Sequence, residues 1–117
     1  METKTGGCHC GKVKYEVSVD LSKPVIECNC SHCQVKGLLL SFVPESSFKI
    51  ISGENELSEY RFNTGKISHL FCQSCGVESF GKGKNSKNEG TVAINVRTID
   101  DIDLTTLHRM PYDGKKV

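Results

Sequence analysis

The chain has 117 residues, of which 37% are hydrophobic and 7% aromatic, and it contains no tryptophan. With so few apolar residues, the hydrophobic core must be small. We therefore expect a single domain over residues 1–117 that needs a further stabilising cross-link besides its core. Fifteen Lys and Arg residues against fourteen Asp and Glu give a net charge of +1. This balance excludes the strongly basic surface typical of nucleic-acid-binding proteins. No apolar run reaches the roughly 18–20 residues that span a bilayer, and the first residues are polar, so we expect a soluble, cytoplasmic protein.

Short alternating or apolar runs predict a mainly β fold. Residues 12–19 alternate polar and apolar side chains, which is typical of a half-buried strand. Residues 25–26 make a short apolar approach to the cysteines that follow. Further strands are predicted at residues 38–43, 48–51, 59–63, 66–71, 77–80 and 91–96. No stretch keeps a helical apolar period, so we expect six to eight short strands.

The remaining segments are predicted to connect these strands. Residues 34–37 are expected to be a polar connector, and residues 81–90 a mobile hydrophilic loop. Residues 99–107 have room for one helical turn. Residues 108–113 are expected to form a closing edge segment in which Pro111 makes strand pairing poor.

Seven cysteines are the most informative residues of the chain, and they fall into a doublet, a triplet and a second doublet. These are Cys8 and Cys10, then Cys28, Cys30 and Cys33, then Cys72 and Cys75. Their number is odd, their spacing is tight, and the polar first residues lead us to expect no secretory leader. Zinc ligation is therefore favoured over disulfide bonding.

The seven thiols divide most simply into a closed site of four and an open site of three. A structural zinc site has four protein ligands, whereas a catalytic one keeps a position for water or substrate. The doublets would form the closed site and the triplet the open one. Other partitions stay open, because the triplet could instead recruit a distant cysteine or one of His9, His32 and His69. Two purely structural zinc ions are a further alternative.

An open zinc site with three thiolates favours chemistry at sulfur. Three thiolates and one Zn²⁺ leave a formal charge of −1, which weakens the Lewis acidity of the metal compared with a three-histidine site. Zinc binds thiols well and holds them as thiolates at neutral pH. The triplet therefore points to the formation or cleavage of a C–S bond rather than to amide or phosphate hydrolysis.

Four motifs carry a resemblance to a known family across about residues 6–113. They are Gly7-Cys8-His9-Cys10-Gly11-x-Val13-x-Tyr15, Cys28-Asn29-Cys30-Ser31-x-Cys33, Phe62-Asn63-Thr64, and Phe71-Cys72-x-x-Cys75-Gly76-x-x-x-Phe80. In combination they resemble the glutathione-dependent formaldehyde-activating enzymes, a family that also contains relatives of centromere protein V.

The resemblance implies an Mss4-like fold of small antiparallel sheets organised around two zinc ions per chain. It implies a structural zinc on Cys8, Cys10, Cys72 and Cys75, and a catalytic zinc on Cys28, Cys30 and Cys33. It also implies a carbon–sulfur lyase that adds formaldehyde reversibly to the thiol of glutathione. The expected partner is thus a small thiol, with neither nucleic acid nor membrane, and the oligomeric state is left open.

Several further residues are candidates around the open site. His69 could act there as an acid–base group or hydrogen-bond donor, and Ser31 or Asn63 could bond the thiolates. The anionic substrate would favour nearby cations, for which the candidates are Lys36, Arg61, Lys66 and Arg97. Two other functions stay open: a non-catalytic zinc-stabilised binding module, and a thiol-redox or metal-handling protein.

Overall fold

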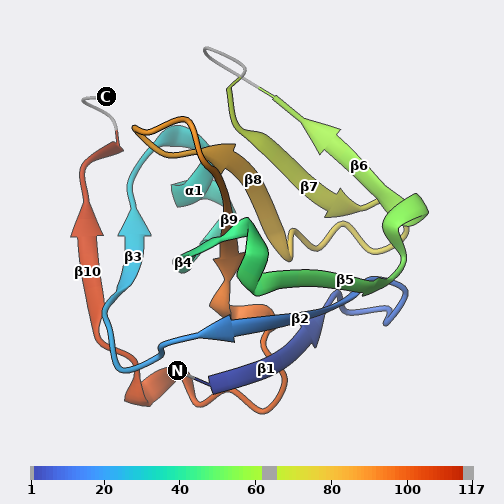
Figure 1. Cartoon of the computed structure of the whole chain (residues 1–117), viewed down its shortest axis with the longest axis horizontal. Helices are drawn as coiled ribbons and strands as arrows, with labels where there is room; N and C mark the ends of the chain where they lie inside the picture. The colour runs from blue at the N-terminus through green and yellow to red at the C-terminus, as the bar shows by residue number, and fades with distance from the viewer. Residues whose placement is uncertain (1, 62–65, 115–117) are drawn as a thin grey trace.

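The structure, a computed structural model, describes residues 2–61 and 66–114, and its strands form two sheets (Figure 1). The smaller sheet has the order β1-β2-β5 and consists of β1 (Glu2–Gly7), β2 (Lys14–Val19) and β5 (Phe48–Ser52). All of its pairs are antiparallel. In the view of Figure 1 it runs across the lower end of the larger sheet.

The larger sheet has seven strands in the order β10-β3-β4-β9-β8-β7-β6. Its members are β3 (Val25–Cys28), β4 (Leu40–Pro44), β6 (Leu57–Tyr60), β7 (Ser68–Cys72), β8 (Phe80–Lys84), β9 (Gly90–Asn95) and β10 (Arg109–Tyr112). Every pair is antiparallel except β10 with β3, which is parallel. That pair brings the last described residues beside the cysteine triplet.

Helical structure in the described residues is confined to short segments. One α-helix, α1 (Ser31–Lys36), follows β3 directly. The others are single 3-10 turns: η1 (Glu45–Ser47), η2 (Glu54–Glu56), η3 (Val96–Thr98) and η4 (Leu104–Thr106).

Three aromatic side chains join the two sheets in the main core. Tyr15 of β2 and Phe48 of β5 have ring centroids 5.7 Å apart, and Phe48 lies 4.6 Å from Phe80 of β8. Tyr15 and Phe80 are almost completely buried. Tyr15 also makes a 2.8 Å hydrogen bond through its hydroxyl to that of Thr98. This contact fixes β2 to η3, and burial raises the pKa of Tyr15 to about 12.

The prediction of a mainly β fold built of small sheets is confirmed, but several local predictions are wrong. The structure has ten strands in its described part rather than six to eight. It adds β1 in the polar N-terminal segment, where Lys and Thr side chains gave no apolar alternation. Residues 34–37 are not a connector, since residues up to Lys36 belong to α1. Six residues are too few to show a helical apolar period.

Three other segments also differ from expectation. Much of the loop predicted over residues 81–90 is strand, because β8 runs to Lys84 and β9 starts at Gly90. The strand predicted at 77–80 begins only at Phe80. Pro111 does not prevent pairing, since β10 pairs in parallel with β3 through it. A proline is compatible with an edge strand because its missing N–H can face away from the ladder.

Two predictions lie partly or wholly outside the described residues. The strand predicted at 59–63 appears as β6, which ends at Tyr60, and Phe62, Asn63 and Thr64 are outside the described part. Within residues 2–61 and 66–114, no helix has the length and apolar character needed to cross a membrane.

Candidate metal centres

The two cysteine doublets, more than 60 residues apart in sequence, come together at one end of the main core. Cys8 and Cys10 lie in the turn after β1, whereas Cys72 ends β7 and Cys75 follows it. Their sulfur atoms all lie within 4.8 Å of one another. The Sγ atoms of Cys8 and Cys10 are 3.5 Å apart, and those of Cys10 and Cys72 are 3.7 Å apart. Tetrahedral zinc with bonds of about 2.3 Å would separate its sulfurs by about 3.8 Å, so this set fits the metal.

The backbone around the doublets is arranged to hold thiolates. The amide of Val13 donates to the Sγ of Cys8 at 3.3 Å. Gly11 and Gly76, directly after the doublets, have φ values of 83° and 80°, a conformation that side chains disfavour. Backbone N–H groups, that of Val77 first, lower the pKa of Cys75 to about 6. A low thiol pKa favours the charged form that binds metal.

The triplet is a local structure made by the junction of β3 and α1. Cys28 ends β3, Cys30 is the N-cap of α1, and Cys33 lies within the helix. The amide of Cys30 donates to the Sγ of Cys28 at 3.4 Å, and the amide of Cys33 donates to the Sγ of Cys30 at 3.3 Å. The three sulfurs lie within 4.8 Å of one another. The three sulfurs are therefore close enough to share one ion, and backbone amides already donate to two of them.

The thiols of the triplet differ in their tendency to ionise. Burial raises the pKa of Cys33, and its neighbours Cys30 and Cys28 raise it further. Burial also acts to raise the pKa of Cys30, but the N–H of Cys33 and the neighbouring thiols outweigh it, so that pKa is lowered. All seven cysteines of the chain are free thiols. A soft divalent cation such as zinc would compensate the charge of several adjacent thiolates, so this donor set fits the metal as well.

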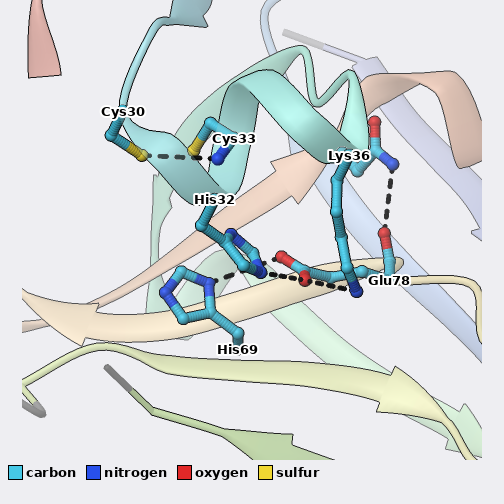
Figure 2. A network of polar contacts seen from close by, with 7 residues as sticks. Cys30, His32, Cys33, Lys36, His69 and Glu78 are labelled. Atoms are coloured by element: carbon cyan, nitrogen blue, oxygen red, sulfur yellow. Dashed lines mark hydrogen bonds and ion pairs between the residues drawn. The ribbon is translucent and has the colours of Figure 1, made fainter. Parts of the chain in front are cut away.

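A third group of possible metal ligands lies beside the triplet, formed by His32, His69 and Glu78 (Figure 2). His32 Nε2 is 3.2 Å from Glu78 Oε1, and His69 Nδ1 is 3.5 Å from Glu78 Oε2. The two imidazole rings have centroids 4.0 Å apart. Lys36 Nζ also lies 3.2 Å from Glu78 Oε1. Burial lowers the pKa of His32, against the opposing influence of Glu78.

Sequence reasoning found the two histidines of this group but missed Glu78. A carboxylate between Val77 and Phe80, in a stretch predicted to be a strand, was the available signal. The acid is in fact buried, and the side-chain amide of Asn95 donates to its backbone carbonyl at 3.0 Å. The backbone amide of Asn95 donates to Ser79 O at the same distance. Strand β9 therefore fixes the position of Glu78.

The remaining candidates are dispersed. His9 is exposed, and no group of possible metal ligands in the described chain includes it. Arg97 donates from Nε to the carbonyl of Gly37 at 2.9 Å. Arg61 pairs with Glu59 at 2.6 Å, and Lys66 is exposed. Ser31 is the first residue of α1, and Asn63 lies outside the described residues.

Comparison with known proteins gives two findings. The family model described as glutathione-dependent formaldehyde-activating enzyme matches residues 3–111. The crystal structure of a Rhodobacter sphaeroides protein, solved as a structural genomics target, has a TM-score of 0.80 and 27% sequence identity. The similarity covers 92% of this chain and 97% of that one. The relative thus shares both the fold and nearly the full extent of the chain.

Proposed function

Because this chain belongs to the glutathione-dependent formaldehyde-activating enzyme family, we propose that it is a zinc-dependent carbon–sulfur lyase. Its substrate would be the adduct of a small thiol, such as glutathione, with formaldehyde or a related aldehyde. In the forward direction the thiol sulfur bonds to the carbonyl carbon, and the S–H proton passes to the carbonyl oxygen. The reverse reaction cleaves the same C–S bond, and neither direction needs an oxidant or a reductant.

The observation that carries this proposal is the gathering of three thiols, Cys28, Cys30 and Cys33, as a group of three donors. The other four cysteines form a group of their own. A four-coordinate zinc on the triplet would keep one position for an external ligand. When bound there, zinc would supply a site that holds the substrate thiol as its thiolate. We assign the structural zinc to Cys8, Cys10, Cys72 and Cys75.

Side chains and backbone amides of the chain would orient the thiols of the site and set its local charge. The amides of Cys30 and Cys33 donate to two of the sulfurs and so keep them directed to one point. Lys36, at the C-terminal end of the same helix, has a side chain that is 34% exposed. It is the basic residue in the last turn of α1, and its positive charge would favour an anionic thiol nearby. A role for His69 as an acid–base group at the triplet stays a prediction, since the structure shows contacts of its side chain with His32 and Glu78.

The test is a direct measurement of adduct formation. Zinc-loaded protein is mixed with glutathione and isotopically labelled formaldehyde, and the exchange between free and thiol-bound aldehyde is followed by NMR. We expect faster exchange with the protein than without it, and Cys30→Ser should abolish the acceleration. Val35→Ala is the matched control, because Val35 lies on the same helix with its side chain exposed to solvent.

Three outcomes would contradict the proposal. Unchanged acceleration in Cys30→Ser would show that the triplet is not the reacting site. A protein that binds two zinc ions but accelerates no thiol–aldehyde pair would instead be a zinc-stabilised binding module. Loss of zinc with oxidation of the triplet under mild oxidants, without turnover, would indicate a redox or metal-handling role.

A further inference from the structure

We propose that His32, His69 and Glu78 form a third metal site, distinct from both cysteine clusters, for a divalent first-row transition ion such as zinc. The inference does not depend on the lyase activity. It rests on the convergence, distances, burial and donor chemistry of these three side chains, which lie together in Figure 2, apart from the sulfurs of Cys30 and Cys33.

Three separate elements of the fold bring these ligands together. His32 comes from the first turn of α1, His69 from β7, and Glu78 from the segment between β7 and β8. The segment with Glu78 is held by two bonds to Asn95, as described above. A site assembled from fixed backbone has a preformed geometry, and this limits the entropy lost on binding an ion.

The distances between the donor atoms fit a small cation. Bonds of about 2.0–2.2 Å from zinc to imidazole nitrogen and carboxylate oxygen would place tetrahedral donors about 3.3–3.5 Å apart. His32 Nε2 lies 3.2 Å from Glu78 Oε1 and His69 Nδ1 lies 3.5 Å from Glu78 Oε2, so each imidazole is near this separation from one oxygen of the carboxylate. One donor atom from each of the three residues can be chosen so that all lie within 4.8 Å of one another.

Because these side chains are buried, a bound cation would stabilise the negative charge of Glu78. The side chains of His32, His69 and Glu78 are only 7%, 10% and 4% exposed. A buried carboxylate is costly unless a positive charge compensates it. In the structure, Lys36 Nζ, 3.2 Å away, supplies that charge from the rim. Its long side chain is 34% exposed and can swing into solvent, so a divalent ion could replace the ammonium at Glu78.

The donor set also separates this site chemically from its neighbours. Two imidazoles and one carboxylate make a harder site than three or four thiolates, and they suit zinc, iron(II), nickel or cobalt. Three protein ligands leave at least one coordination position for water or another small ligand. The proposed ion would therefore be exchangeable, and more weakly held than the metal at the doublets.

Cobalt titration of the whole chain can distinguish this site from the other two. Cobalt bound by thiolates gives intense charge-transfer absorption in the near ultraviolet, whereas an imidazole–carboxylate site gives only weak visible bands. We expect the charge-transfer signal to saturate after two equivalents, with a third equivalent that adds visible absorption alone. Equilibrium dialysis against zinc should likewise show three ions bound per chain at saturating metal.

Variants test the assignment of the ligands. His69→Gln should lower the affinity for the third metal ion by at least about tenfold, a loss comparable to that seen when a supporting residue of other metal sites is removed. It should leave the charge-transfer signal of the first two equivalents unchanged. Glu78→Gln, almost isosteric, should do the same, and it provides a second variant if His69→Gln fails to fold. His108→Gln is the matched control, because His108 is exposed.

Lys36→Gln provides a test in the opposite direction. Removal of the competing Lys36 ammonium should raise the affinity for the third metal ion by about tenfold, because a positive charge that repels the metal ion is lost. A wild-type protein that binds only two equivalents would overturn the proposal, as would an unchanged third equivalent in both His69→Gln and Glu78→Gln. In either case the group would be a buried ion-pair network only.

Discussion

The two cysteine clusters occupy different kinds of surroundings. The doublets bring together segments far apart in the sequence, and Cys8 and Cys72 belong to the main core that joins the two sheets. The triplet lies within six residues of chain, and Cys33 packs in a small separate core with Leu38 and Leu40. A metal at the doublets would close a long loop of the chain, whereas a metal at the triplet would order a single turn. We therefore expect the metal at the doublets to contribute mainly to the stability of the fold, and the metal at the triplet mainly to catalysis.

The largest effect that tests this comparison is expected from Cys72→Ser. Cys72 is completely buried, and the change removes a donor that links β7 to the turn after β1. Loss of a structural metal removes folding free energy directly, so we expect a loss of more than about 4 kcal/mol in the free energy of unfolding. Circular dichroism in urea together with zinc analysis measures it. Native-like stability in this variant would mean that the doublets do not hold the fold together.

Chelation should separate the two clusters without a mutation. A mild chelator should remove metal from the triplet first, because that site is open and local, while the circular dichroism spectrum stays native. Metal at the doublets should leave only together with unfolding. A zinc-responsive dye and circular dichroism, recorded on the same sample, follow both events. Simultaneous release from both clusters would remove the distinction drawn here.

Gly114→Ala should disturb the triplet selectively. A Cβ atom at this position would lie 2.5 Å from Cys28 Sγ and 2.9 Å from Cys30 Cβ, too close for either contact. We expect metal binding at the triplet to weaken by roughly tenfold, as for residues that support metal ligands elsewhere, with little change in global stability. Gly83→Ala is the control, since its Cβ would meet only Ile67 Cγ1 at 3.7 Å. Competition with a chelator of known affinity gives the change.

The smallest effect is expected from Tyr15→Phe, which acts on the sheets and on neither cluster. It removes the 2.8 Å hydrogen bond to Thr98 but keeps the ring in contact with Phe48. The loss of one such bond should lower the free energy of unfolding by about 1 kcal/mol, without a change in metal content. Tyr112→Phe, at an exposed tyrosine, should have no effect. Urea denaturation of both variants checks the difference.

Sequence reasoning worked best where residue identity alone constrains the chemistry. Cysteine spacing led to the same grouping of the seven thiols that the structure brings together, because few other arrangements of that residue type are useful. Alternation located β2, whose buried Tyr15, Val17 and Val19 face the core. Residue patterns did not predict the short or polar elements β1 and α1.

Apart from the grouping of the cysteines, long-range relations were not accessible from the sequence. The parallel pairing of β10 with β3 depends on how the ends of the chain meet, and no local pattern encodes it. Glu78 could not be placed beside His32 and His69, because the three residues come from different elements that only the folded sheet aligns. Their significance depends on burial and distance, which spacing along the chain does not reveal.

The capping of α1 by Cys30 has a thermodynamic consequence. A helix of six residues is too short to be stable by its own hydrogen bonds, so it depends on its cap, in which the sulfur of Cys30 accepts from the amide of Cys33. An ion on the triplet would fix that sulfur and with it the helix that carries His32. Occupancy of the triplet and of the proposed histidine site would then be positively cooperative. By reciprocity, each ion would raise the affinity for the other by the same factor.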